Sequence, residues 1–180
     1  MKKNELKEII KSDKRLYKDK SLKKNFYYIL SNNPRRKILK YIIYHRKCVF
    51  YKNKNNRLYY KLLFLIYSNR KNRLGIKLNL DIGNCELGKN VMIYHRNIVI
   101  NPYSNIGNNC KFHGNNCIGN KNDELKAPTL ENNIDIGFGA SIIGDVYIAE
   151  GIKIGANSIV TKSFYEKNIT IAGNPAKKIK

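Results

Sequence analysis

An aliphatic residue recurs at every sixth position in the second half of this chain. The repeated positions are Leu130, Ile136, Ile142, Ile148, Ile154 and Val160. A step of six residues turns an α-helix by about 600°, which would scatter these side chains around its axis. The same step is three strand periods and keeps every side chain on one face. The spacing therefore predicts strands.

Each repeat contains one short strand and one corner. A second small or apolar residue precedes most of the repeated positions by two: Ile134, Ala140, Val146, Ile152 and Ser158. The corners, such as Gly137-Phe138-Gly139, are rich in Gly and Asn, which adopt left-handed backbone angles at low cost. Such a unit buries its apolar residue only by stacking on its neighbours, so the period predicts a parallel β-helix with three strands per coil. A sandwich of ordinary strands, the alternative, would not keep this phase.

Several units also carry a family resemblance. Ile136-Gly-Phe-Gly-Ala-Ser, Ile142-Ile-Gly-Asp-Val-Tyr, Ile154-Gly-Ala-Asn-Ser-Ile-Val and the tail Ile171-Ala-Gly-Asn-Pro-Ala-Lys resemble the hexapeptide-repeat acyltransferases. The chain is most similar to serine acetyltransferases and to the O-acetyltransferases of bacterial surface polysaccharides, over about residues 75 to 180. The resemblance implies a left-handed β-helix, a homotrimer and acetyl-CoA as the acetyl donor.

Charge divides the chain unevenly. Residues 1 to 73 hold 23 of the 35 Lys and Arg residues but only 4 of the 13 Asp and Glu residues. We expect a basic α-helical segment at residues 1–74, with helices over 35–51 and 58–67. The β-helix follows at 75–165, interrupted by a polar loop at 119–129, and residues 166–180 form a C-terminal tail.

The basic segment leaves three interpretations open. It could be the helical cap found in related proteins, a peripheral contact with an anionic membrane through residues 1–73, or a nucleic-acid surface. Dense basic residues favour contact with anionic lipid. Nucleic acid is disfavoured because the sequence shows no binding motif for it. The apolar run at residues 58–67 is too short to cross a bilayer.

The cysteine pattern favours a reducing compartment. Cys48, Cys85, Cys110 and Cys117 show no CxxC spacing, and no secretory signal is visible. We therefore expect a cytoplasmic protein, with a peripheral position at the inner membrane face if the basic segment meets lipid. Cys110 occupies a small inward position and is expected in the core, not as a catalytic thiol.

The early repeats are less regular. Ile82 and Leu87 are five residues apart, whereas seven separate Ile93 from Ile100. The extra residue predicts a bulged corner, and this corner carries His95. Acetyl transfer needs positioning and a base for the hydroxyl proton, a role that imidazole suits.

The resemblance implies that His95 is the general base. His113, one coil later, is expected to contact the acceptor or assist the base, and an exposed His without a role is the alternative. The resemblance also implies an acidic residue that orients the base. Asp81 is nearest, although the match requires a one-residue gap.

The sequence departs from the serine acetyltransferase pattern in two places, and both bear on the identity of the acceptor. Related serine acetyltransferases carry an Asp immediately before the catalytic His, where this chain has Tyr94. They also carry a basic residue and a second His before the next repeat block, where this chain reads Lys126-Ala127-Pro128. Unpaired polar groups discriminate strongly between substrates. We therefore expect a saccharide or glycan hydroxyl as acceptor, contacted by Tyr94 and His113, with L-serine as the alternative.

The resemblance places acetyl-CoA along the outside of the β-helix, between subunits. The corners at Gly139-Ala140 and Ala156 to Ser158 are expected to offer backbone N–H groups to it, and Lys162 and Lys177 to meet its phosphates. No metal is expected. A zinc carbonic anhydrase on the same repeat is a rival interpretation, but it needs three His ligands and the β-helix offers only His95 and His113.

Overall fold

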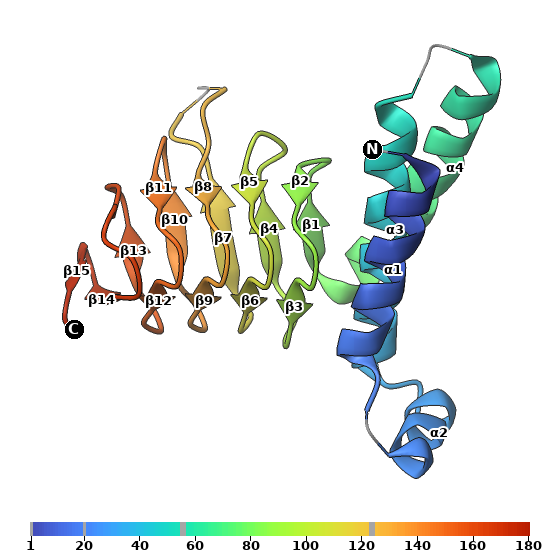
Figure 1. Cartoon of the computed structure of the whole chain (residues 1–180), viewed down its shortest axis with the longest axis horizontal. Helices are drawn as coiled ribbons and strands as arrows, with labels where there is room; N and C mark the ends of the chain where they lie inside the picture. Colours follow the sequence, from blue (N-terminus) through green and yellow to red (C-terminus); the bar gives the residue numbers. More distant parts are fainter. Residues whose placement is uncertain (1, 20, 55–56, 123–124) are drawn as a thin grey trace. The chain divides into compact units, whose positions relative to one another are not determined.

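The computed structural model describes residues 2–19, 21–54, 57–122 and 125–180. The chain divides into two compact units, residues 1–78 and 79–180. The first is helical and the second is built of short strands, and each is described by itself (Figure 1).

The helical unit contains α1 (Lys3–Tyr17), α2 (Leu22–Leu30), α3 (Pro34–Lys52) and α4 (Leu58–Leu78). α3 begins where its sequence predicts, because the Asn33 side chain accepts a hydrogen bond from the N–H of Arg35 and Pro34 occupies the first turn. Asn32 precedes this cap with a left-handed φ of 52°. α1 is fixed to α3 by a buried ion pair, in which Arg46 Nε lies 3.1 Å from Asp13 Oδ2.

The helix predicted over residues 58–67 is longer in the structure. α4 runs on to Leu78, and Gly75 is buried in its last turns. The β-helix, which the sequence predicts from residue 75, therefore starts only with β1 (Leu80–Ile82). Among the described helices, none combines the length and apolarity needed to span a bilayer.

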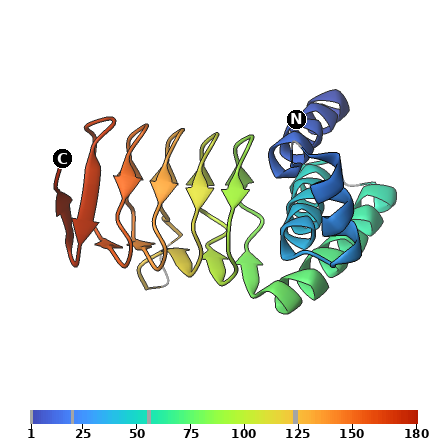
Figure 2. The same cartoon turned by 90° about the horizontal axis from the view of Figure 1, so that it is seen from below.

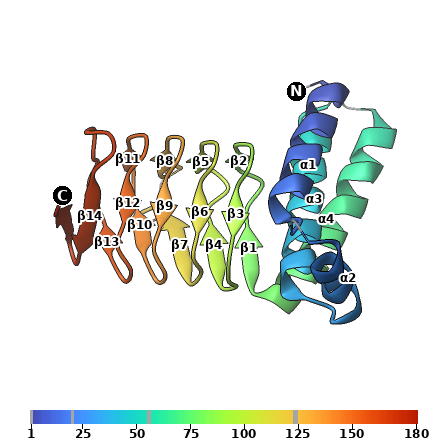
Figure 3. The ribbon, with the colours of Figure 1, turned by 60° about the horizontal axis from the view of Figure 1, so that its bottom comes forward.

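The second unit is a parallel β-helix, as predicted. From β1 to β13, consecutive strands pass in turn to three sheets, and from β4 onward each of them pairs in parallel with the strand one coil earlier (Figures 2 and 3). The first sheet contains β1, β4 (Ile98–Ile100), β7 (Asn116–Gly119), β10 (Ser141–Ile143) and β13 (Ile159–Val160). The second contains β2 (Glu86–Leu87), β5 (Asn105–Ile106), β8 (Thr129–Leu130) and β11 (Tyr147–Ile148). The third contains β3 (Met92–Ile93), β6 (Lys111–Phe112), β9 (Asp135–Ile136), β12 (Lys153–Ile154), β14 (Thr170–Gly173) and β15 (Ala176–Lys178).

The repeated aliphatic positions form the core of this unit. All six members of the series from Leu130 to Val160 are buried, as are the second-position residues from Ile134 to Ser158. Most coils have nearly the same length, since Leu80 pairs with Ile98 and Met92 with Lys111. The step from Lys111 to its partner Asp135 is longer, because this coil includes the predicted loop. Residues 123 and 124 of that loop lie outside the described residues.

Asn and Gly turn the corners. Asn90, Asn109 and Asn133 hold the same corner of successive coils, each with a φ near +60°. Their side-chain amides bond from coil to coil at 3.1 and 3.0 Å. The preference of Asn for left-handed angles and its capacity to bond to the next coil explain why this residue recurs there.

The expected C-terminal tail includes strands. β14 pairs in parallel with β12 and adds to the third sheet, and β15 returns antiparallel to β14. The residues at 171–177 that carry the family resemblance thus form a hairpin at the end of this sheet.

Neighbouring residues on β12 provide a test of the core. We expect Ile154→Ala to lower the free energy of unfolding by about 2 to 5 kcal/mol, because it leaves a cavity among buried aliphatic side chains. Lys153 points outward from the same strand, so Lys153→Ala should change stability by no more than about 0.5 kcal/mol. Urea denaturation of both variants measures the difference. Equal losses would contradict the assignment of inner and outer faces.

Candidate functional site

The candidate site lies at the corner between the third and the first sheet. Three residues, Tyr94 to Arg96, separate Ile93 from the left-handed Asn97, whereas two separate Phe112 from Asn115 in the next coil. The extra residue is the bulge that the seven-residue step predicted. It leaves Tyr94, His95 and Arg96 exposed.

His95 lies directly over the next coil at Gly114. A Cβ atom on Gly114 would stand 2.6 Å from the Cβ of His95, and Gly114 has a φ of +112°. Both conditions favour glycine, since an L side chain would be strained and would collide with the histidine. The bulge holds its place by hydrogen bonds, because the Arg96 carbonyl accepts from the N–H of Asn115 at 3.0 Å.

A second histidine, His113, lies in the coil that follows His95 and contacts Tyr94. The ring of His113 stacks on the ring of Tyr94, with centroids 4.9 Å apart. His113 Nε2 lies 2.8 Å from Asp135 Oδ1, and Nε2 must donate because a carboxylate only accepts. Lys111 Nζ is 3.8 Å from the other oxygen of Asp135.

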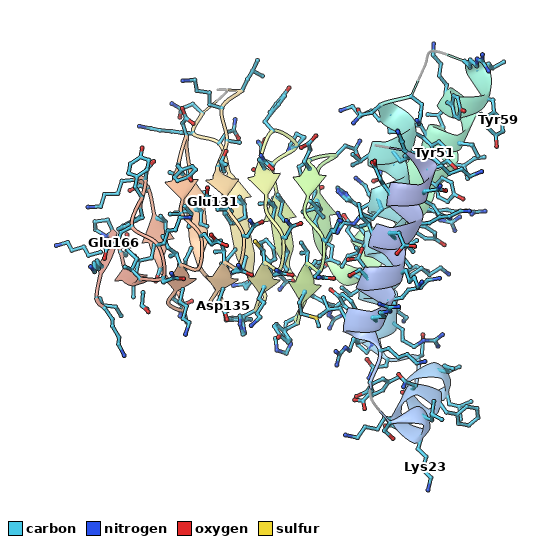
Figure 4. All side chains as sticks on the ribbon, in the orientation of Figure 1. Lys23, Tyr51, Tyr59, Glu131, Asp135 and Glu166 are labelled. Atoms are coloured by element: carbon cyan, nitrogen blue, oxygen red, sulfur yellow. The ribbon has the colours of Figure 1, made fainter. Side chains whose placement is uncertain are left out.

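Asp135 and Lys111 were not predicted as site residues. Asp135 lies on the face that carries β3, β6, β9 and β12 (Figure 4). Alternation placed its side chain outward, next to the inward Ile136. Its alignment with His113 depended on how many residues of the 119–129 loop belong to the coil, which the sequence left open.

Asp81 is not brought to His95. It lies exposed on β1, opposite Val99 in the first sheet. Among the described residues, no hydrogen bond or ion pair joins the Asp81 carboxylate to the His95 ring. The role of Asp81 in orienting the base stays a prediction.

The predicted donor corners lie in line with His95. Backbone hydrogen bonds give the register of the coils at this corner: the N–H groups of Asn115, Gly139 and Asn157 donate to the carbonyls of Arg96, Gly114 and Phe138. The residues that occupy the corner in successive coils are therefore His95, Gly114, Phe138 and Ala156. Coils spaced by about 4.8 Å put Ala156 roughly 14 Å along the axis from His95. His95 and two of the residues predicted to bind acetyl-CoA, Gly139 and Ala156, thus share one edge of the β-helix.

The backbone N–H groups that are free to bind acetyl-CoA differ in part from those that the sequence predicts. The N–H groups of Gly139 and Ala140 already donate to Gly114 and Gly137. In the described part of the chain, the N–H groups of Phe138 and Ala156 have no such acceptor. Both residues are exposed, so their N–H groups could hold the amide carbonyls of a pantetheine arm.

The other residues predicted to bind acetyl-CoA lie in separate places. Ser158 is buried, and its Oγ accepts a hydrogen bond from the N–H of Gly173 at 3.2 Å. Lys177 pairs in register with Ala172. A Cβ atom placed on Gly155 would lie 2.8 Å from the Cβ of Ala172, so Lys177 lies near the corner that holds Ala156. Lys162 follows β13 at a different corner, with its Nζ 5.6 Å from the Phe164 ring centroid.

Cys110 is buried, as the sequence predicts for a core residue, whereas Cys117 is half-buried. Burial raises the pKa of Cys110 to about 11, so its thiol stays protonated near neutral pH. Burial also raises the pKa of Cys117. Across the described residues, no three His, Cys, Asp or Glu side chains gather closely enough to hold a metal ion.

Comparison with curated proteins finds serine acetyltransferases, whereas no protein-family model matches the chain. The protein of Synechococcus elongatus is 31% identical over 96 residues, covering 52% of this chain and 39% of the relative. That of Buchnera aphidicola subsp. Acyrthosiphon pisum is 33% identical over 112 residues, covering 59% and 40%. This chain thus spans about two fifths of the length of these relatives.

Solved structures agree in fold. A serine acetyltransferase from Brucella abortus in complex with coenzyme A superposes with a TM-score of 0.77 at 23% identity, over 98% of this chain and 68% of that one. The soybean enzyme complexed with serine gives 0.76 at 23% identity, over 97% and 69%. A β-helix of the opposite hand would not superpose, so the left-handed fold is confirmed. The resemblance to hexapeptide-repeat acyltransferases of the serine acetyltransferase kind is confirmed by the sequence relatives.

Thiol reactivity tests the core position of Cys110. With a pKa of about 11, about one thiol in a thousand is ionised at pH 8, so we expect alkylation by iodoacetamide to be very slow in the folded protein. Unfolding in urea removes the burial and should make all four cysteines react. Peptide mass mapping gives the site. Rapid labelling of native Cys110 would contradict its burial.

Proposed function

We propose that this protein transfers the acetyl group of acetyl-CoA to a hydroxyl group, with L-serine as the acceptor. The observation that carries the proposal is the exposed His95 on one edge of a β-helix whose sequence relatives are serine acetyltransferases. The coenzyme A named with the Brucella abortus structure supports the donor. The relatives thus favour serine over the saccharide that the sequence analysis expected.

The charged side chains near His113 support serine. The sequence alone disfavours this acceptor because Tyr94 stands in place of the Asp that would meet its ammonium group. Asp135 offers a carboxylate in contact with His113, and Lys111 offers an ammonium group beside it. These two groups could pair with the ammonium and carboxylate of serine, so that neither charge is left without a partner.

His95 would act as the general base. It accepts the proton of the acceptor hydroxyl while the oxygen attacks the thioester carbonyl carbon. The carbon–sulfur bond then breaks, and the proton passes to the CoA sulfur, leaving an O-acetyl ester and free CoA. The free N–H groups of Phe138 and Ala156 would fix the donor along the same edge, so most of the protein's contribution is positioning.

A saccharide acceptor is the second candidate. Tyr94 stacks on His113 and is 47% exposed, and the two rings offer a flat apolar surface beside His95. Such a surface suits the apolar face of a sugar ring better than it suits serine. The same donor and the same base would serve both acceptors.

We also propose a homotrimer and a cytoplasmic place for the protein, as the resemblance and the cysteine pattern imply. The exposed edge that carries His95 and Ala156 supports the trimer, because a neighbouring subunit could close it into a groove. Sedimentation at about three times the chain mass of 20.9 kDa is what this assembly requires.

A thiol-release assay with acetyl-CoA tests the acceptor. We expect kcat/KM with L-serine to exceed that with free or nucleotide-linked sugars by at least roughly tenfold, because only serine pairs with both Asp135 and Lys111. Asp135→Asn and Lys111→Gln should raise KM for serine. A preference for sugars, with no effect of these two variants, would favour the second candidate.

Substitution of the two histidines tests the base. We expect His95→Ala to lower kcat by roughly two to four orders of magnitude while CoA still binds, since a general base contributes about that much. His113→Asn keeps a side-chain N–H for Asp135 and should cost about tenfold or less. CoA binding is measured by calorimetry alongside the rates. The reverse order of effects would assign the base to His113.

A further inference from the structure

A strongly basic pocket lies wholly within the helical unit. It has a volume of about 710 Å³ and lies among α2, α3 and α4. Six of its lining side chains are cationic: Arg36, Lys37, Lys40, Arg70, Arg73 and Lys77. Its size is that of a small-molecule site.

The spacing on two helices builds the basic walls. Arg36 and Lys40 are four residues apart on α3, and Arg70, Arg73 and Lys77 follow the three- and four-residue steps of one face of α4. Residues at these steps are neighbours on a helix surface, so like charges repel each other there. Within the described residues, none of the six cations has a carboxylate within ion-pairing distance. An anion in the pocket would relieve this repulsion.

The pocket also has apolar walls. Leu39, Ile43 and Leu74 lie between the cations, and Tyr28 and Tyr44 add aromatic rings. A ligand that fits must therefore carry both negative charge and apolar groups.

The short helix α2, which supplies Tyr28, favours lipid as that ligand. None of its nine residues is buried, and Leu22, Phe26 and Leu30 are 78%, 62% and 70% exposed. Lys23 projects from the same helix, at the opposite end of the helical unit from Tyr51 and Tyr59 (Figure 4). An amphipathic helix with exposed large apolar residues and adjacent cations is typical of a segment that lies in a membrane interface.

We propose that this pocket binds the phosphate headgroup of an anionic phospholipid while α2 inserts its apolar side chains into the membrane interface. The six cations surround the phosphate, and Leu39, Ile43 and Leu74 contact the first part of the acyl chains. A soluble phosphate ester would leave Phe26 and Leu30 in water. A nucleic acid would do the same. The proposal is independent of the proposed acetyl transfer.

Vesicle flotation with the 180-residue chain tests the proposal. We expect binding to vesicles of phosphatidylglycerol and phosphatidylcholine, and little binding to phosphatidylcholine alone, at physiological ionic strength. The triple variant R36Q/K40Q/R73Q should lose at least about tenfold in partitioning, because each removed charge weakens the attraction to anionic lipid.

A matched variant separates the pocket from general charge. K7Q/K11Q/K61Q removes the same number of positive charges, three, from exposed positions on α1 and α4 outside the pocket. This variant should change partitioning by about threefold or less. The exposed pair F26S/L30S leaves the charge unchanged and should weaken partitioning about fivefold or more, since apolar burial is lost. Circular dichroism checks that each variant keeps its helices.

Other outcomes would overturn the proposal. Equal losses in the two triple variants would indicate attraction by net charge alone. The absence of vesicle binding by the unaltered chain would exclude the lipid site. Binding of duplex DNA in preference to vesicles, unaffected by F26S/L30S, would assign the pocket to nucleic acid. Displacement of the chain from vesicles by inorganic phosphate at low concentration would assign it to a soluble phosphate ligand.

Discussion

The β-helix depends on the stacking of each coil upon the next. A coil holds only short strands, so its backbone groups find partners only in the neighbouring coils. Its inward Ile, Leu and Val side chains are likewise buried only when a neighbour covers them. Both requirements are met at once when coils keep a common length. This explains why the register holds from coil to coil and why the one long coil excludes its surplus as a loop.

The candidate site is a local departure from that regularity. One extra residue at a corner leaves the backbone hydrogen bonds of the coil intact on both sides but pushes Tyr94, His95 and Arg96 outward. Gly114 makes room below them. The regular corners of later coils then continue the same edge, which ends at Ala156. A fixed scaffold with one bulge thus sets the His95 imidazole and the N–H groups of Phe138 and Ala156 along one edge, which is the kind of arrangement that the proposed acetyl transfer needs.

The two units differ in charge and in the ligands that their surfaces favour. In the β-helix, Lys111 near the site lies within ion-pairing distance of Asp135. In the helical unit, cations gather on adjacent faces of α3 and α4 without such balance. The first arrangement suits a small acceptor with both charges, whereas the second suits an anion at a membrane surface. Part of the excess positive charge of the N-terminal segment is therefore concentrated at one pocket.

The order of amino acids was enough to predict the β-helix, its inward columns, the bulged corner at His95 and the core position of Cys110. These follow from local period, because an inward residue at every sixth position is sufficient to define a strand and a corner. The folded chain was needed to show that Asp135 contacts both His113 and Lys111 and that six cations line one pocket. These contacts join residues from different coils or different helices. Their alignment depends on loop length, coil register and helix packing, which no short stretch of sequence encodes.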